Sequence, residues 1–288
     1  MFPVPTKDLL LWIKETSLNG EDKEALYLLI DLVGGISKKK ILSYLINPPE
    51  IIFMKESLNN LKQKWFDHIS NFKPVQYISE FSYWRDLKFK ISKDVLIPRV
   101  ETEQIIDIVY GFVEKKNKVL FADLGTGSGV ISISLAVSNP HWFGLATDID
   151  ENVIKIAESN FERFKNLSNL EFYIGNWFDP LIKFAGEIDL VIANPPYIPT
   201  NVYEKLPLSV KNYEPRIALC GGKDGLLHIS KIIKDSPLFL KKGGWLILEN
   251  HYDQSEKVKK LLIKSGFELV DTIKDLFGIG RFTIGRYK

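Results

Sequence analysis

The chain has 288 residues and a formal net charge of +2 at pH 7. Hydrophobic residues make up 45% and charged residues 26%, an ordinary globular balance that excludes a low-complexity or collagen-like chain. The single cysteine, Cys220, excludes an internal disulfide framework, and the histidines stand too far apart to pair as ligands, so we expect no metal site. No apolar run approaches the ~18 residues that span a bilayer, and the first residues lack a signal-peptide pattern. These features favour a cytoplasmic protein that does not contact membranes.

Basic and acidic side chains are balanced along the chain. The local clusters Lys38-Lys39-Lys40 and Lys257, Lys259 and Lys260 are flanked by apolar residues at helical spacing, which is typical of solvated helix faces. Binding to the phosphate backbone of a duplex needs several clustered basic side chains. We therefore expect no direct contact with nucleic acid.

Residues 1–75 are predicted to form a small all-helical domain. Leu9 and Ile13 belong to a group of apolar residues at the spacing of one helix face, and Asn19-Gly20 ends that segment. The later predicted segments are Glu21–Val33, a short helix capped by Ser37 that runs to Leu45, a segment opened by Pro48-Pro49, and Leu58–Ile69.

Residues 76–100 have a different pattern. Apolar and polar residues alternate between Tyr77 and Ile91, which is the period of half-buried strands. This alternation predicts a short β-hairpin that links the helical domain to the rest of the chain.

Residues 101–288 alternate between strands and helices. The strands are very apolar, which predicts a mostly parallel sheet covered by helices on both faces, an α/β fold of Rossmann-like type. Only a short turn region separates the last two strands, so they are expected to pair antiparallel at one edge. The predicted helices are Glu101–Val113, Val130–Val137, Glu151–Phe164, Gly225–Ile233 and Gln254–Ser265, and the predicted strands are Val119–Ala122, Phe143–Thr147, Glu171–Ile174, Leu190–Ala193, Trp245–Glu249, Phe267–Thr272 and Arg281–Arg286.

A glycine-rich turn joins the first of these strands to the next helix. It reads Asp123-Leu124-Gly125-Thr126-Gly127-Ser128-Gly129. Glycines let a backbone turn sharply and approach a ligand closely. The dinucleotide pattern G-x-G-x-x-G fails by one position because Val130 stands where its third glycine belongs, and no Gly-Lys-Ser/Thr follows as in a phosphate-binding loop.

An acid, Asp148, ends the second strand of this region. A carboxylate there can accept hydrogen bonds from both hydroxyls of a ribose. Together with Asp123 and the glycine turn, it suits a ligand that has a ribose and a positive charge but no pyrophosphate, and S-adenosylmethionine fits that description. The structural alternatives are a plain strand-to-helix turn at Gly125–Gly129 and a helix N-cap at Asp148.

A second motif, Asn194-Pro195-Pro196-Tyr197, follows the fourth strand. The two prolines stop the strand and stiffen the chain. The Asn194 side-chain oxygen and the Pro195 carbonyl can both point into the crevice above the sheet, where two acceptors would hold a planar NH₂ group, and Tyr197 offers a flat face for stacking. The structural alternative is a Pro-Pro turn with an Asn cap.

These two motifs resemble those of methyltransferases that modify amino or amide NH₂ groups. Over nearly its whole length the chain is similar to the HemK/PrmC family, which methylates the glutamine of the Gly-Gly-Gln motif in peptide chain release factors. Further segments carry the resemblance: Pro74-Val75-Gln76-Tyr77-Ile78, Leu96-Ile97-Pro98-Arg99, and Tyr213-Glu214-Pro215 with Gly221-Gly222-Lys223-Asp224-Gly225-Leu226.

The resemblance implies a Rossmann-like class I S-adenosylmethionine-dependent methyltransferase sheet with a small all-helical N-terminal domain. It also implies roles for residues of both motifs. Gly125, Thr126, Gly127, Ser128 and Gly129 would wrap the methionine part of S-adenosylmethionine, Asp148 would hold the ribose, Trp177 would lie against the adenine, Asn194 would contact cofactor and substrate, and Pro195, Pro196 and Tyr197 would complete the substrate site, with Asn194 and Pro195 as the catalytic pair.

The chain departs from the family pattern at three positions. Asn176 stands where an Asp is frequent, which removes an acidic contact expected near the adenine. Val100 follows Pro98-Arg99 in place of a proline, and Gly280 stands where an Asp is usual. None of the three belongs to the inferred methyl-transfer centre.

Two other functions remain open on the residues alone. A DNA or RNA adenine methyltransferase shares the Asn-Pro-Pro-Tyr motif, but it should carry a basic target-recognition segment. A binding module without enzymatic activity would not need two aligned acceptors at Asn194 and Pro195. The balanced charge favours a protein substrate, and residues 1–75, which carry no chemistry of their own, are expected to dock the release factor.

Overall fold

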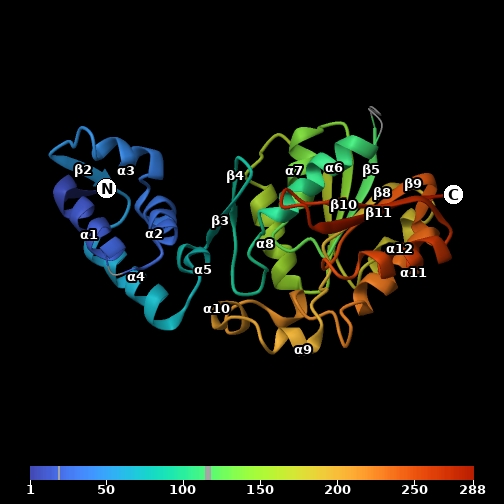
Figure 1. The fold of residues 1–288 in the computed structure, drawn as a ribbon. Helices are drawn as coiled ribbons and strands as arrows, with labels where there is room; N and C mark the ends of the chain where they lie inside the picture. The colour runs from blue at the N-terminus through green and yellow to red at the C-terminus, as the bar shows by residue number, and fades with distance from the viewer. Residues whose placement is uncertain (19, 114–117) are drawn as a thin grey trace. The chain divides into compact units, whose positions relative to one another are not determined.

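The computed structural model describes residues 1–18, 20–113 and 118–288, and it divides into two compact units (Figure 1). The first unit comprises Met1–Ser82 and Leu208–Tyr213. The second unit comprises Tyr83–Pro207 and Glu214–Lys288. Among the described residues, none of the helices is long and apolar enough to cross a membrane.

The first unit is a small helical bundle with its own core. Side chains cap several of its helices: Asp22 accepts from two backbone N–H groups, and Ser37 and Ser57 accept from one each. The core gathers apolar side chains from every main helix, among them Leu9, Leu26 and Leu61. The helices are α1 (Thr6–Leu18), α2 (Lys23–Leu29), which continues into the π-helical turn η1 (Ile30–Gly34), α3 (Lys38–Tyr44), α4 (Leu58–Asn71), α5 (Val75–Ser79) and α10 (Leu208–Lys211).

The prediction that residues 1–75 are all-helical was wrong in one respect. Strand β1 (Phe2–Pro5) pairs antiparallel with strand β2 (Ile51–Met54). Pro3 and Pro5 lack an N–H and argue against a strand in sequence, but prolines are tolerated in an edge strand, and this two-stranded sheet consists of edges only. The segment after Pro48-Pro49 is therefore extended.

A β-hairpin lies within the range where the alternation predicts one, but it begins only at Phe81, because Tyr77 and Ile78 belong to helix α5. Strand β3 (Phe81–Trp84) pairs with strand β4 (Leu87–Lys90) in a separate two-stranded sheet. The role of residues 76–100 as a linker stays a prediction.

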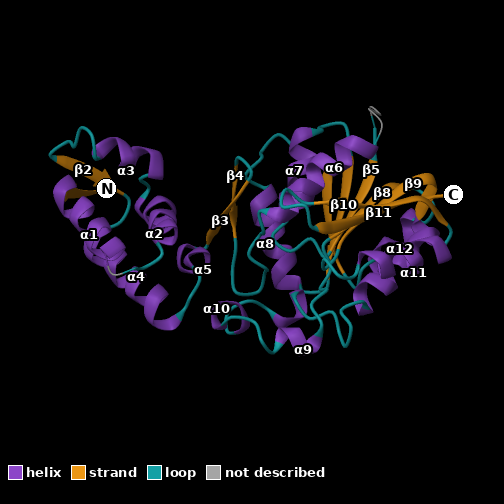
Figure 2. Cartoon of the chain, viewed as in Figure 1, coloured by secondary structure: helices purple, strands orange, loops and turns teal. Residues whose placement is uncertain are grey.

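The second unit is built on a seven-stranded sheet, drawn in orange in Figure 2. The strand order is β10-β11-β9-β8-β5-β6-β7, and the pairs from β9 to β7 are parallel. Strand β11 runs antiparallel to both β9 and β10, so the predicted antiparallel edge is confirmed. The strands are β5 (Leu120–Leu124), β6 (Phe143–Asp148), β7 (Leu170–Ile174), β8 (Ile188–Ala193), β9 (Leu240–Glu249), β10 (Phe267–Lys274) and β11 (Gly280–Tyr287).

Helices cover both faces of this sheet. Successive strand residues point to opposite faces, so Phe121 packs in one core cluster while its neighbour Ala122 packs in the other. The first cluster includes side chains of α6 (Gln104–Phe112), α7 (Val130–Ser138) and α8 (Glu151–Phe161), and the second includes those of α11 (Leu227–Phe239) and α12 (Ser255–Lys264). The predicted three-layer α/β architecture is therefore confirmed.

Several short elements were not predicted, because single turns carry too few residues to show a period. They are the 3₁₀ turns η3 (Asp179–Phe184) and η4 (Arg216–Ala218) and the one-turn helices α9 (Thr200–Tyr203) and α10, whereas the 3₁₀ turn η2 (Glu101–Glu103) is the first turn of the helix predicted over Glu101–Val113.

Candidate active site

The candidate site lies at the carboxyl ends of four parallel strands in the second unit. Strands β5 and β8 are neighbours, and the register pairs Leu124 with Ala193, so the glycine turn and Asn194 begin at the same level of the sheet. The chain proceeds from β5 to β6 and β7 on one side and returns to β8 on the other, which makes the β5–β8 boundary a topological switch point. Open α/β sheets bind ligands at such points.

The glycine turn has the open conformation that the sequence predicts. Gly125, Gly127 and Gly129 all have positive φ. A Cβ added to Gly127, whose φ is +58°, would meet no atom within 4 Å, so the backbone there borders free space. A Cβ at Gly129 would instead lie 2.7 Å from Ile133, so this glycine serves the packing of α7. Gly127, in the middle of the turn, is therefore open to a ligand, whereas Gly129, at its end, packs against the protein core.

A buried carboxylate holds the turn in shape. Oδ2 of Asp123 accepts from the Thr126 hydroxyl at 2.7 Å and from the Ser132 N–H at 3.1 Å. Burial raises the pKa of Asp123 to about 6, although the hydrogen bonds from Thr126 and Ser132 stabilise its charged form and lower the pKa. Its other oxygen, Oδ1, is buried without a hydrogen-bond partner among the described residues. Asp123 thus shapes the turn and leaves one acceptor to be satisfied.

Asp148 ends β6 beside the same turn. Its Oδ2 accepts from the Gly127 N–H at 3.1 Å and its Oδ1 from the Asp150 N–H at 3.3 Å. Burial raises the pKa of this carboxyl above its ordinary value. The N-cap of α8 is Asp150, so the alternative that Asp148 is the helix cap is wrong. Asp148 instead lines a cleft at this end of the sheet.

Trp177 lies after the third strand end, where β7 is followed by Gly175 and Asn176. It is a non-glycine residue with positive φ, +57°, a conformation that is uncommon and often marks a functional position. A Cβ on Gly125 would lie 3.0 Å from the Trp177 ring, and the His228 ring is centred 5.6 Å away. The indole therefore forms a wall beside the glycine turn.

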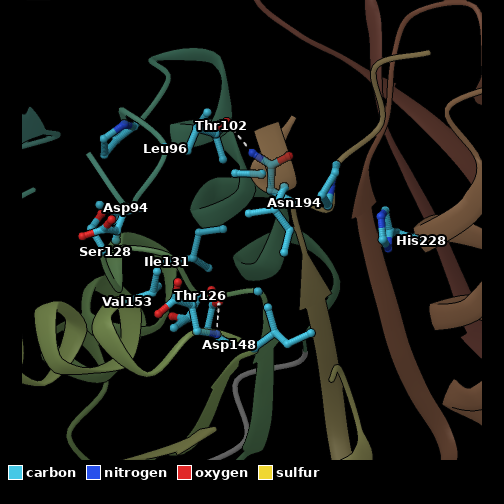
Figure 3. Close-up of a pocket in the computed structure, with 18 of the residues that line it drawn as sticks. Asp94, Leu96, Thr102, Thr126, Ser128, Ile131, Asp148, Val153, Asn194 and His228 are labelled. Carbon is cyan, nitrogen blue, oxygen red and sulfur yellow. Dashed lines mark hydrogen bonds between the residues drawn. The ribbon is translucent and has the colours of Figure 1, made fainter. Parts of the chain in front are cut away.

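Asn194 lies at the fourth strand end with a defined amide orientation. Its Nδ2 donates to the Thr102 hydroxyl at 3.3 Å (Figure 3). No hydrogen bond to its Oδ1 exists among the described residues, so this acceptor remains available. Pro195 and Pro196 are buried.

Tyr197, the last residue of the Asn-Pro-Pro-Tyr turn, is held by hydrogen bonds to two side chains. The Tyr197 hydroxyl donates to Glu249 at 3.1 Å, and the Tyr197 carbonyl accepts from Gln254 at 2.9 Å. A Cβ on Gly225 would lie 2.1 Å from the same carbonyl, so the Gly221–Gly225 segment can pack there only with glycine. The Gly221–Gly225 segment, one of those that carry the family resemblance, therefore packs directly against the Asn-Pro-Pro-Tyr turn.

One cleft brings most of the predicted residues together. Seven of them line it: Gly125, Thr126, Ser128, Asp148, Trp177, Asn194 and Pro196 (Figure 3). Within the described part of the chain, the lining does not include Gly127, Gly129, Pro195 or Tyr197. Tyr197 is instead directed toward Glu249, although the sequence predicts that its face stacks on the substrate.

The cleft also contains residues that sequence reasoning did not assign. Arg99 pairs with the buried Glu214 at 2.7 Å, and both belong to segments that carried the resemblance without a role. Thr102, Trp84, Asp94 and His228 are among the other residues that line the cleft. No sequence signal isolates these residues, because they come from a linker, a 3₁₀ turn and a helix far apart in the chain.

The three departures from the family pattern lie in different environments. Asn176 lines the cleft, and Val100 is exposed. A Cβ at Gly280 would lie 3.0 Å from Thr272, so an aspartate there would need its neighbours to move. Among the described residues no group of histidine, cysteine and acidic side chains could hold a metal ion.

The fold and the site define a class I methyltransferase, and comparisons agree. Residues 114–275 match the family described as "Methyltransferase domain". The hMettl16 catalytic domain, solved in complex with a MAT2A 3′UTR hairpin, shares the fold with a TM-score of 0.61 at 21% identity, over 76% of this chain and 83% of that chain.

Curated relatives narrow this class of enzyme to one family. A release factor glutamine methyltransferase of Prochlorococcus marinus is 37% identical over 96% of this chain and 95% of its own length. One of Coxiella burnetii is 38% identical over 74% of this chain and 75% of its own length. The chain belongs to the family of release factor glutamine methyltransferases.

The methyl donor of this class is S-adenosylmethionine, and the cleft fits it. Gly125, Thr126 and Ser128 of the glycine turn line the same cleft as Asp148 and Trp177, and a Cβ on Gly127 between them would meet no atom within 4 Å. Asp148 would hold the ribose, the glycine turn the methionine part and Trp177 the adenine.

Removal of the Asp148 carboxylate should weaken cofactor binding. Hydrogen bonds to a charged group contribute about 1.5–3 kcal/mol each, so Asp148→Ala is expected to raise the Kd for S-adenosylmethionine by about 10- to 100-fold. Asp148→Asn keeps one acceptor oxygen and should lose less. Calorimetry on the two folded variants checks this, and an unchanged Kd for Asp148→Ala would remove the ribose role.

Proposed function

We propose that the enzyme transfers a methyl group from S-adenosylmethionine to the side-chain amide nitrogen of the glutamine in the Gly-Gly-Gln motif of release factors. The observation that carries this proposal is the free Oδ1 of Asn194 in the same cleft as the glycine turn. The names of the relatives support release factors as the protein substrate. Since release factors act in translation, we place the reaction in the cytoplasm.

The chain promotes this reaction by positioning. An amide nitrogen is a poor nucleophile because its lone pair is delocalised into the carbonyl group. When bound, S-adenosylmethionine supplies a methyl group that a positively charged sulfur activates. The Asn194 oxygen would accept one N–H of the substrate amide. The carbonyl of Pro195, which is buried and not part of the cleft lining, would accept the other once the substrate amide reaches it. Two such bonds fix the plane of the amide and raise the electron density on its nitrogen.

No side chain is assigned as a general base. The nitrogen forms its new bond to carbon and then loses one proton to water, so a strong base is not needed before transfer. Tyr197 does not serve as one, since burial and the neighbouring Glu249 raise its pKa and keep the phenol protonated.

The glutamine of a Gly-Gly-Gln motif suits a narrow cleft. Its two neighbouring glycines have no side chains to exclude, so an extended segment can enter. The cleft alone would also admit other glutamines, and contacts remote from it would give the preference for release factors. We propose that residues 1–75 supply these contacts and dock the substrate.

Deletion of the helical unit tests this docking role. A shortened chain of residues 80–288 should show a KM for intact release factor raised at least tenfold, because the remote contacts are lost. Its KM for a short Gly-Gly-Gln peptide should change little. Cofactor affinity of the shortened chain is the control for folding, and equal effects on both substrates would contradict the docking role.

A competition assay tests the substrate class. Release factor and duplex DNA are mixed with enzyme and labelled S-adenosylmethionine, and we expect label in the protein only. Label in DNA alone would favour the adenine methyltransferase alternative.

A further inference from the structure

A groove of about 590 Å³ lies on the helical unit, lined by residues of helices α1 and α2 and of the α3 segment (Figure 1). Leu11 and Leu18 of α1 line it, and Leu45, the C-cap residue of α3, lines it as well. These three leucines are 54%, 76% and 60% exposed. Apolar side chains that gather in a groove and stay exposed mark a surface that binds another molecule.

Three lysines, Lys7, Lys14 and Lys23, line the same groove. Lys7 and Lys14 are seven residues apart, so they lie two turns apart on one side of α1. The acids of α1, Asp8 and Glu15, are outside the lining, and among the described residues no acidic side chain belongs to it. This lysine-rimmed groove therefore combines exposed leucines with positive charge of one sign.

The acids around Lys23 in the chain already have other partners. Asp22 caps α2, and Glu21 accepts from an indole N–H at 2.6 Å. Glu24 pairs with Lys38 at 2.6 Å. In the described part of the chain, no ion pair joins any of the three groove lysines to an acid. The positive charge of the groove is thus left for an acidic partner.

The walls of the groove favour a helix as the occupant. The Ser17 hydroxyl in the lining already donates to the Ile13 carbonyl at 2.7 Å, and helices pair their backbone groups internally. An extended peptide would find no strand edge there to pair with, whereas a helix satisfies its own backbone. Leu11 and Leu18 lie two turns apart, ~10 Å along α1, which suits a partner helix with apolar residues at the same spacing.

We propose that the lysine-rimmed groove binds an amphipathic helix of the protein substrate, with apolar residues on one face and acidic residues beside them. That this substrate is a release factor rests on the proposed function, whereas the chemistry of the occupant rests on the groove. A second copy of the chain packed groove to groove would bring the lysines of both copies together, so charge disfavours that occupant.

The first test reverses the charge of the groove. Lys7→Glu/Lys14→Glu should raise the Kd of the enzyme for intact release factor about tenfold at low salt, because two ion pairs are lost. The difference should shrink at high salt, which screens exposed charges. Both lysines are exposed, so the core is untouched, and fluorescence anisotropy of labelled release factor gives the Kd.

Lys39→Glu/Lys40→Glu is the matched control. These lysines are exposed on α3 in the same unit and lie outside the groove lining, so the net charge changes equally. We expect this variant to keep the original Kd within about twofold. An unchanged Kd in Lys7→Glu/Lys14→Glu, or an equal loss in both variants, would overturn the proposal.

The second test truncates the apolar part of the groove. Leu11→Ala/Leu18→Ala removes side chains that are exposed in the free enzyme, so thermal unfolding should change little. The Kd for intact release factor should rise about tenfold, because apolar burial in the complex is lost. The KM for a short Gly-Gly-Gln peptide should stay the same. An unchanged Kd for release factor would contradict the role of the leucines.

The third test identifies the occupant. A photo-crosslinking amino acid in place of Leu18 is activated in the complex with release factor, and mass spectrometry identifies the linked peptide. The expected peptide is an amphipathic helical segment with acidic residues. A link only to a basic segment, to an extended segment or to a second copy of the enzyme would overturn the proposal.

The outcomes separate this inference from the proposed function. If release factor is methylated and the groove variants bind it as the original chain does, the groove is not the docking site while the function stands. If release factor binds through the groove but its glutamine is not methylated, the function is wrong while the docking site stands.

Discussion

Replacement of Asn194 by alanine is expected to lower kcat by a factor on the order of 10²–10³, because one well-placed acceptor at the reacting group is lost. Its Oδ1 is the free acceptor at the end of β8, and its Nδ2 is already bound to Thr102. The side chain should matter more in the transition state, where the N–H groups become more acidic, than for cofactor binding. The Kd for S-adenosylmethionine should therefore change far less than kcat.

Asn176→Ala is the matched control for this variant. Asn176 lines the same cleft after β7, so the same side chain is truncated away from the proposed transfer centre. We expect this variant to change cofactor affinity more than kcat. Single-turnover kinetics on both folded variants make the comparison, and near-normal turnover by Asn194→Ala would contradict the proposed mechanism.

Replacement of Gly127 by valine is expected to abolish detectable binding of S-adenosylmethionine. The added side chain would point into free space in the glycine turn, where no atom lies within 4 Å, and would occupy the volume proposed for the methionine part of the cofactor. The positive φ of Gly127, +58°, adds strain, because a β-branched residue is rarely found there.

Gly186→Val separates the effect of strain from that of occupied volume. Gly186 also has positive φ and open space around its Cβ, but it lies in an exposed turn and neither of its chain neighbours lines the cleft, whereas both neighbours of Gly127, Thr126 and Ser128, do. A similar loss of stability in both variants, with cofactor binding lost in Gly127→Val alone, is the expected result. Calorimetry supplies the affinities and thermal unfolding the stabilities. Undiminished binding by folded Gly127→Val would contradict the cofactor site.

The sheet was predictable because its signal is local. Apolar strands such as β5, β6 and β9 are each followed by a turn and a helix, and the pattern recurs along the chain. The pairing of β1 with β2 was not predictable in this way. The two strands are far apart in sequence, and Pro3 and Pro5 argue against a strand in any prediction from the local sequence.

The candidate site was predictable where its residues belong to motifs. The glycine turn and Asn194 are placed together because β5 and β8 are neighbours, which the class of fold implies. Thr102 could not be found from the sequence, since it comes from η2 and meets Asn194 only in the folded chain. The orientation of Tyr197 toward Glu249 likewise depends on burial, which no motif encodes.

The central claim is the identity of the methylated atom, and mass spectrometry tests it most directly. A release factor is incubated with the enzyme and S-adenosylmethionine, and its fragments are compared with those of a sample that lacks enzyme. The expected result is the mass of one added methyl group on the glutamine side chain of the Gly-Gly-Gln motif. An unmodified glutamine after incubation with folded, cofactor-binding enzyme, or a methyl group only on another residue, would contradict it.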